Sequence, residues 1–162
     1  MAIIRLMNEN DYEGKGYVHY QSWIETYTGL IDQNYLNTRT LDKCIDIAKK
    51  YPENTFVSEV DGKIVGFASY GQCHDEDLNN AGEIYAIYVL KAYQNQGIGK
   101  MLMDACINAL KDYQSIVVWA LATNDKTIGF YQHLGFIKDG KTKVADLKIT
   151  SLNVVRLIRG MR

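Results

Sequence analysis

The sequence predicts an α/β sandwich, in which a mixed and mainly antiparallel central sheet has helices on both faces. Three observations predict this fold. Strand-like and helical segments alternate in an irregular order, with some strands adjacent along the chain. The run Ile116–Ala122 is unbroken and apolar, which is typical of a strand covered on both faces. One strongly amphipathic helix between two strand-like runs provides a crossover between parallel neighbours.

The first half of the chain is predicted to hold a strand, two helices and a hairpin. Gly29 provides a stop for the first helix, and Asp61-Gly62 is a strong turn signal between two strand-like runs. The predicted elements are, in order, a strand over Ile3–Met7, a helix from Asp11 to about Tyr27, a helix over Leu41–Lys50 that ends before Pro52, and strands over Thr55–Val60 and Lys63–Cys73.

The second half begins with a polar loop from His74 to Gly82. Apolar residues from Ile98 to Tyr113 then recur on one helical face, and Gly135 provides a stop for a later helix. The predicted elements are strands over Glu83–Val89, Ile116–Ala122, Phe136 to about Val144 and Ile149–Ile158, with helices from Ile98 to Tyr113 and over Asn124–Leu134.

The bulk composition predicts one domain over residues 1–162 in a cytoplasmic protein. A chain of 162 residues, 47% of them hydrophobic, can bury a core without metal or disulfides. The net charge of -1 argues against a nucleic-acid partner, and no apolar run is long enough to span a membrane. Cys44, Cys73 and Cys106 lie far apart, which argues against a zinc site and favours buried thiols in a reducing cytosol.

The clearest candidate for a ligand site is the loop Gln94-Asn95-Gln96-Gly97-Ile98-Gly99, which leads into the strongest helix. Backbone N–H groups at a helix start lack intrahelical partners, and the helix dipole adds partial positive charge. Glycines let a ligand approach the backbone closely. The loop therefore predicts an anion site suited to a diphosphate, with Lys100 adding positive charge. A tight turn into the helix, without a ligand, is the alternative.

Two common phosphate-binding motifs do not fit this loop. A P-loop requires Gly where the chain has Gln94, and Ser or Thr where it has Met101. The dinucleotide fingerprint requires a third Gly where the chain has Leu102. Both motifs are therefore excluded.

The loop resembles a third motif. Gln94-x-x-Gly97-x-Gly99 after a strand is similar to the (R/Q)xxGxG(A) motif of the GNAT superfamily of N-acetyltransferases, and the segments EIYAIYV and LKAYQNQGIGKMLM resemble its cofactor-binding core. The segment from Asn124 to Phe136 resembles the second motif, NxxAxxFYxxxGF, with Thr127 where the family usually has Ala. The motifs cover roughly a third of the chain in matching order, and the strand pattern extends the match to nearly the whole length.

The resemblance implies a GNAT-type acyl-CoA N-acyltransferase fold, with acetyl-CoA as acetyl donor and no metal. The loop amides should hold the coenzyme A diphosphate, and the strand before it should lie beside the pantetheine arm and splay from Ile116–Ala122. A backbone N–H near Ile87 or Tyr88 would stabilise the oxyanion. The implied cofactor-binding residues are Ile87, Tyr88, Val89, Gln94, Asn95, Gln96, Gly97, Ile98, Gly99, Lys100, Asn124 and Tyr131.

The resemblance also implies catalytic roles. Tyr131 matches a tyrosine near the coenzyme A sulfur, where a phenol can donate a proton to the departing thiolate; packing beside Phe130 is the alternative. Asn124 matches a residue that contacts the cofactor or holds the splayed strand, and a helix N-cap is compatible with either role.

The acceptor amine must lose a proton before it attacks, so a general base is expected. Glu83 is the preferred base, since several family members carry a glutamate there that acts directly or through water; a surface carboxylate at a strand end is the alternative. His74 is the second candidate, because imidazole titrates near neutral pH. Direct attack in a ternary complex needs no covalent intermediate, so Cys73 has no expected nucleophilic role.

The resemblance also implies that the acceptor pocket lies beside the segment after the first strand. Trp23 and Tyr27 are the candidate substrate contacts, together with Glu83, although aromatic residues at helical spacing are also typical of a core. The acidic loop Asp75-Glu76-Asp77 would attract a polycation unless it is simply solvated.

The predicted function is transfer of an acetyl group to a primary amine of a small molecule. The alternatives are a protein N-terminal or lysine acetyltransferase and a non-catalytic coenzyme A-binding regulatory module. Superfamily members often dimerise, so the resemblance suggests a homodimer, although the sequence carries no decisive apolar patch for one.

Overall fold

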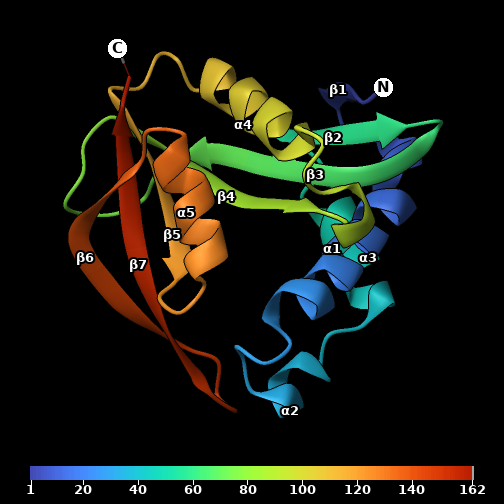
Figure 1. Cartoon of the computed structure of the whole chain (residues 1–162), viewed down its shortest axis with the longest axis horizontal. Coiled ribbons are helices and arrows are strands. Elements are labelled where there is room, and N and C mark those ends of the chain that lie inside the picture. The colour runs from blue at the N-terminus through green and yellow to red at the C-terminus, as the bar shows by residue number, and fades with distance from the viewer. Residues whose placement is uncertain (162) are drawn as a thin grey trace.

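The computed structural model describes residues 1–161 and forms a seven-stranded sheet with the strand order β1-β2-β3-β4-β5-β7-β6 (Figure 1). Strands β4 and β5 are parallel, and every other neighbouring pair is antiparallel. The predicted mixed, mostly antiparallel sheet with one crossover is therefore confirmed. The elements are β1 Ile3–Leu6, η1 Glu9–Asp11, α1 Tyr12–Tyr27, α2 Gln33–Leu36, α3 Leu41–Lys50, β2 Thr55–Val60, β3 Lys63–Gln72, β4 Ala81–Val89, η2 Lys91–Tyr93, α4 Ile98–Ala109, β5 Ser115–Leu121, α5 Asp125–His133, β6 Ile137–Asp146 and β7 Ser151–Gly160.

Helices cover both faces of this sheet. Helices α1 and α3 pack together against one face, and α4 and α5 lie on the other (Figure 1). On strand β5, Ile116, Val117 and Val118 are fully buried: Ile116 and Val118 belong to the main core, and Val117 packs with Cys73 and Ala81 in a separate cluster. This burial confirms the expectation from its unbroken apolar run. No helix within residues 1–161 is long and apolar enough to cross a membrane.

The predicted turn between β2 and β3 is also confirmed. Asp61 and Gly62 have φ angles of 50° and 78°, so both occupy the left-handed region that two-residue hairpin turns of type I′ require. Helix α3 ends at Lys50, before Pro52. These local signals act within a few residues, which is why the sequence alone reveals them.

Some boundaries differ from the prediction. Helix α4 ends at Ala109 rather than near Tyr113, because the last apolar residues of its pattern leave the helix and cover the start of β4. A Cβ atom built on Gly82 would lie 3.0 Å from Leu110 and 3.1 Å from Tyr113. The four-residue helix α2 was not predicted; it is too short for a periodic pattern, and its signal is the Asp32 side chain, which accepts a hydrogen bond from the Asn34 N–H.

The feature that positions the site is the separation of β4 and β5. These strands pair only where Ala81–Glu83 meets Ser115–Val117. Beyond Glu83 and Val117 they diverge, and Figure 1 shows the two parts of the sheet turning away from each other. The expected splay is therefore present, and it leaves facing edges of both strands without a neighbouring strand.

Candidate functional site

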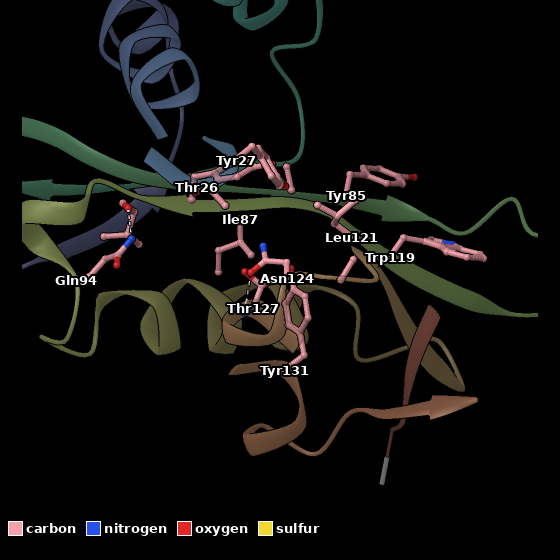
Figure 2. A pocket seen from close by; sticks show the side chains of 14 residues that line it. Thr26, Tyr27, Tyr85, Ile87, Gln94, Trp119, Leu121, Asn124, Thr127 and Tyr131 are labelled. Carbon is pink, nitrogen blue, oxygen red and sulfur yellow. Dashed lines mark hydrogen bonds between the residues drawn. The ribbon is translucent and has the colours of Figure 1, made fainter. Parts of the chain in front are cut away.

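A groove follows the splay. It consists of a cavity of about 620 Å³ beside the start of α4 and a cavity of about 120 Å³ deeper between β4 and β5. The larger volume lies within the range typical of small-molecule sites. In Figure 2 the lining side chains run from Gln94 at one end to Tyr85 and Trp119 at the other. Both cavities share the residues Thr26, Ile87, Val89, Gln94, Asn124 and Thr127.

This groove connects the two faces of the sheet. The Tyr88 ring packs on Phe67 and His19, so it lies on the α1 face. Side chains alternate along a strand, which directs Ile87 and Val89 to the face covered by α4 and α5. Tyr131 from that second face and Tyr27 from the end of α1 line the same small cavity. Two ligands could thus meet in the splay from opposite sides.

The loop before α4 has the backbone of an anion site. Asn95 and Gly97 have φ angles of 63° and 82°, an alternation that turns successive N–H groups toward one side. Gly97 is the N-cap of α4, and within the described residues no side chain caps the helix start. Among residues 1–161, no atom would lie within 4 Å of a Cβ atom on Gly97, so the loop faces open space. The first amides of α4 are therefore free to bind a ligand.

Side chains around this loop hold its shape and add charge. The Gln94 amide donates to the Val89 carbonyl over 3.0 Å and accepts from Lys126 Nζ over 2.9 Å, which ties the loop to β4 and α5. Lys100 lines the larger cavity, and its ammonium pairs with Asp104 at 2.7 Å. Sequence reasoning missed Lys91 and Lys126, which also line this cavity; the available signal was that both lie inside the two segments that resemble the family.

Gly99 has a packing role in addition to its place in the motif. A Cβ atom there would lie 3.3 Å from the Phe130 ring, which is closer than most real contacts. The small residue thus allows α5 to pack closely on the start of α4. Phe130 also lines the larger cavity, so this contact shapes its wall.

The open edge of β4 directs a backbone donor into the splay. The Leu90 N–H donates to the Val65 carbonyl on β3 over 2.9 Å. Donors alternate sides along an extended strand, so the Tyr88 N–H faces β3, whereas the Ile87 and Val89 N–H groups face the open edge. Of the two donors expected from the sequence, the Ile87 N–H is the one directed toward the groove.

Tyr131 and Asn124 both lie in the small cavity, where Figure 2 shows them close to Ile87. Tyr131 is 5% exposed, and this burial raises the pKa of its phenol, so the hydroxyl stays protonated. The Asn124 oxygen accepts from the Thr127 N–H at 3.3 Å, which makes Asn124 the N-cap of α5. The residue therefore caps the helix and lines the groove at once.

The two aromatic residues expected at the acceptor pocket differ in position. Tyr27 lines the small cavity, and its hydroxyl is 3.0 Å from the Tyr88 hydroxyl. Trp23 is absent from the lining of both cavities and packs behind Tyr27, with ring centroids 4.7 Å apart and the Arg39 guanidinium 3.8 Å from its own ring. Sequence reasoning missed Tyr85 and Trp119, which line the other wall and belong to two separate strands.

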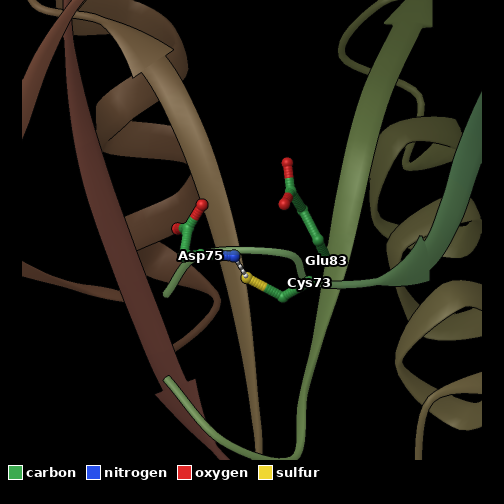
Figure 3. A group of neighbouring side chains, drawn as sticks. All are labelled: Cys73, Asp75 and Glu83. Carbon is green, nitrogen blue, oxygen red and sulfur yellow. Dashed lines mark hydrogen bonds between the residues drawn. The ribbon is translucent and has the colours of Figure 1, made fainter. Parts of the chain in front are cut away.

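Glu83 lies at the last paired position before the splay, opposite Val117. Its half-buried carboxyl is next to Asp75 and Cys73, as Figure 3 shows, and it lies outside the lining of both cavities. Burial and the adjacent Asp75 charge raise the pKa of Glu83 to about 7. Burial also raises the pKa of the Cys73 thiol to about 11, which keeps it protonated near neutral pH. His74 is exposed in the loop beside this cluster.

The acidic loop 75–77 is not free to attract a polycation through all of its charges. Arg156 on β7 pairs with Asp75 at 3.1 Å and with Asp77 at 2.7 Å. These pairs neutralise much of the loop charge, and they lower the pKa of Asp77 to about 2. The expectation of polycation attraction is therefore weakened by a partner that lies about eighty residues away along the chain.

One cluster has the composition of a metal site. Cys73, Asp75 and Glu83 each offer one atom, and these atoms lie within 4.8 Å of one another. Asp75 is already bound to Arg156 and to the Trp119 indole, and the Cys73 thiol is protonated, so two of the three groups are poor ligands as they stand. The expected absence of a metal stays a prediction.

A mixed sheet that splays beside an uncapped, glycine-rich helix start is the arrangement of the GNAT-type acyl-CoA N-acyltransferase fold. The model of the Acetyltransferase (GNAT) family matches residues 17–136 of the chain. The chain belongs to the GNAT family of acetyltransferases and is by family an acetyl-CoA-dependent N-acetyltransferase.

Individual relatives agree with this assignment. YuaI, an uncharacterized N-acetyltransferase of Bacillus subtilis, is 33% identical over 136 residues, which cover 82% of this chain and 78% of the relative. A probable N-acetyltransferase of Mycobacterium tuberculosis is 25% identical over 148 residues, which cover 86% and 82%.

Solved structures share the fold. PH1933 from Pyrococcus horikoshii superposes with a TM-score of 0.77 at 24% identity, covering 100% of this chain and 99% of that one. The PaiA N-acetyltransferase from Thermoplasma acidophilum, crystallised with coenzyme A, gives a TM-score of 0.72 at 19% identity, with 99% of each chain covered.

Proposed function

We propose that this protein transfers the acetyl group of acetyl-CoA to a primary amine of a small molecule, by direct attack in a ternary complex. The observation that carries this proposal is the groove that crosses the sheet where β4 and β5 diverge. It offers the donor an entrance beside α4 and α5 and the acceptor an entrance beside α1. Both reactants can then be present together, as direct attack requires.

The residues around the larger cavity fit coenzyme A. The N–H groups from Gln96 to Lys100 would hold the diphosphate, because the left-handed residues Asn95 and Gly97 present these amides to open space. Lys91 and Lys126 would add positive charge. Ile87 and Val89 would flank the pantetheine arm and bind its amides through their backbone N–H groups at the open edge of β4. Asn124 would contact the pantetheine arm, and it also caps α5.

When bound, acetyl-CoA supplies an acetyl thioester whose carbon–sulfur bond breaks as the carbon–nitrogen bond of the product forms. The Ile87 N–H is directed toward the splay and would donate to the carbonyl oxygen as it gains negative charge. A preorganised donor of this kind contributes about 3 kcal/mol. The Tyr131 phenol, protonated because it is buried, would give its proton to the departing sulfur.

Glu83 would take the proton that the amine releases. The raised pKa of about 7 suits a base that works near neutral pH. Because Glu83 lies outside the lining of the groove, the proton would reach it through a water molecule. The protonated Cys73 thiol beside it is a poor nucleophile, which supports direct transfer over an acetyl-cysteine intermediate.

The size of the acceptor end supports a small amine. The cavity of about 120 Å³ is bounded on the acceptor side by Tyr27, Tyr85 and Trp119. These aromatic walls suit a compact acceptor. A protein N-terminus or a lysine side chain would need an open surface for the flanking peptide.

We also propose that the protein is cytoplasmic and forms a homodimer. Three free, buried cysteines fit a reducing compartment such as the cytoplasm. The edge strand β6 leaves Ile137 and Val144 exposed, which supports a homodimer through this strand. Size-exclusion chromatography with light scattering tests the assembly, and a monomer would contradict it.

Thermal unfolding with acetyl-CoA tests the donor, and a panel of amines assayed for acetylation tests the acceptor. A ligand at 100 times its Kd stabilises the fold by about 2.7 kcal/mol, enough for a clear rise in Tm. No rise would overturn the donor site. Acetylation of small amines over matched peptides is expected. Transfer only to peptides would overturn the acceptor class, and binding without any transfer would indicate a regulatory module.

A further inference from the structure

We propose that Asp75 is a positioning residue. Hydrogen bonds from Arg156 and from the Trp119 indole hold its carboxylate beside Glu83, the proposed general base. Because Trp119 lines the small cavity on the acceptor side, Asp75 contacts both the base and a wall of the acceptor pocket. This inference rests on the proposed function, in which Glu83 takes the proton of the amine. Asp75 itself lies outside the groove lining and acts through its neighbours.

The clamp holds one carboxylate oxygen of Asp75 from two sides. Oδ2 accepts from Trp119 Nε1 at 3.1 Å and from Arg156 Nη1 at 3.1 Å. The backbone N–H of Asp75 also donates to the Cys73 sulfur over 3.5 Å. Side-chain and backbone contacts together fix the position of the residue, although it belongs to a loop between β3 and β4.

Arg156 is a buried arginine that binds three carboxylates. It is 4% exposed, and each of its three nitrogens donates to a carboxylate: Nη1 to Asp75, Nη2 to Asp77 at 2.7 Å, and Nε to Asp139 at 2.7 Å. A buried guanidinium that lost one of these partners would keep the other two. The clamp therefore holds the loop against β6 and β7 while leaving one side of Asp75 for Glu83.

Asp75 brings a negative charge to the base. Figure 3 shows the carboxyl groups of Asp75 and Glu83 extending to the same side of Cys73. The charged and titratable groups that act on Glu83 are Asp75 and Cys73 from the loop, Lys143 from β6, and Tyr85 on its own strand. Asp75 favours the protonated form of Glu83, and Lys143 opposes this effect. The position of Asp75 thus decides how readily Glu83 accepts a proton.

The same contact orients an acceptor-wall residue. Trp119 lines the small cavity, and its N–H is satisfied by Asp75. Lys143 lies 4.1 Å from the centre of the Trp119 ring. An indole held at its N–H and stacked by a cation has little freedom to turn. The Asp75 carboxylate therefore affects both the proton affinity of Glu83 and the orientation of the Trp119 ring that faces the amine.

The acid limb of the kcat/KM profile against pH tests this role. Asp75→Asn keeps an oxygen that can accept from Trp119 and Arg156 but removes the charge. We expect the midpoint of the acid limb to fall by about one pH unit. Asp77→Asn is the matched control, because it removes a carboxylate from the same loop and the same arginine without contact to Trp119. Its midpoint should stay at the wild-type value.

Two results would overturn the proposal: an unchanged midpoint in Asp75→Asn, or an equal shift in Asp77→Asn. Glu83→Gln should abolish the acid limb. If this variant keeps the limb, the base assignment and the role of Asp75 both fail, whereas acetyl transfer by the wild type would still stand. Carboxyl NMR titration of Glu83 in wild type and Asp75→Asn gives the same comparison without turnover, and unfolding curves verify that each variant folds.

Discussion

The hydroxyl oxygens of Tyr27, the last residue of α1, and Tyr88, on β4, lie 3.0 Å apart, and both residues line the small cavity of the groove. Burial raises the pKa of both phenols, so both hydroxyls stay protonated and one donates to the other. This contact joins a helix that borders the acceptor side to the strand that borders the donor.

Removing either hydroxyl should destabilise the fold. Tyr27→Phe leaves the buried Tyr88 hydroxyl without this partner, and Tyr88→Phe does the converse, so each should cost about 1–3 kcal/mol in free energy of unfolding. The double variant should cost less than the sum, because no orphaned hydroxyl remains. Urea denaturation of the four proteins measures the coupling. Strict additivity would show that the hydroxyls are not partners.

Tyr131→Phe should separate turnover from binding. The phenol ring and its packing are kept, whereas the proton donor is lost, so kcat should fall by about 10²-fold. The Kd for acetyl-CoA, measured by calorimetry, should stay near the wild-type value. A variant with wild-type kcat would refute the role of Tyr131 as proton donor, and weaker acetyl-CoA binding with unchanged kcat would indicate a binding role instead.

Gly97→Ala should weaken donor binding. A side chain at a φ angle of 82° costs about 1–2 kcal/mol or forces the loop to change shape, which would turn the amides away from the diphosphate. Gly140→Ala is the matched control, because Gly140 has a φ angle of 86°, has no atom near its Cβ position, and lies in β6. Both variants should lose stability in thermal unfolding, but only Gly97→Ala should raise the Kd for acetyl-CoA. Equal binding by both variants would contradict the anion site.

Glu83→Gln should raise stability at high pH more than at low pH. Because the pKa of Glu83 in the fold is about 7, above its ordinary value of 4.5, the folded state binds this proton more tightly than the unfolded state. Ionised Glu83 therefore destabilises the fold, an effect that grows from pH 4.5 to 7 and is complete above pH 7. The gain in Tm from Glu83→Gln should follow the same course. A gain that is equal at pH 5 and pH 8 would mean that Glu83 has an ordinary pKa.

Much of the fold, and several of the residues that line the groove, could be predicted from the sequence. Three predicted features depend on residues close together in the chain, and the structure has each of them: the turn at Asp61 and Gly62, the apolar strand β5 and the loop before α4. The second motif also predicted functional roles for Tyr131 and Asn124, and both line the small cavity. The predicted helix from Ile98 to Tyr113 was too long, because Leu110 and Tyr113 continue the apolar pattern after α4 has ended at Ala109.

The acceptor side was less predictable. Trp23 and Tyr27 have the same spacing as any amphipathic stripe, yet only Tyr27 lines the groove. Tyr85 and Trp119 come from strands that face each other only after β4 and β5 diverge. Periodicity indicates which face of an element is apolar, but it does not identify which buried residues border a cavity.

By itself, the sequence indicated the order of the main strands and helices, the turn at Asp61 and Gly62 and the resemblance to the GNAT family, because backbone conformation and motif spacing are local properties of the chain. Only the tertiary structure decided the environment of Glu83. Arg156 reaches Asp75 across 81 positions, and Trp119 reaches it across 44. Burial and charge act through space, so the proton affinity of a carboxylate depends on which distant residues the folded sheet brings beside it.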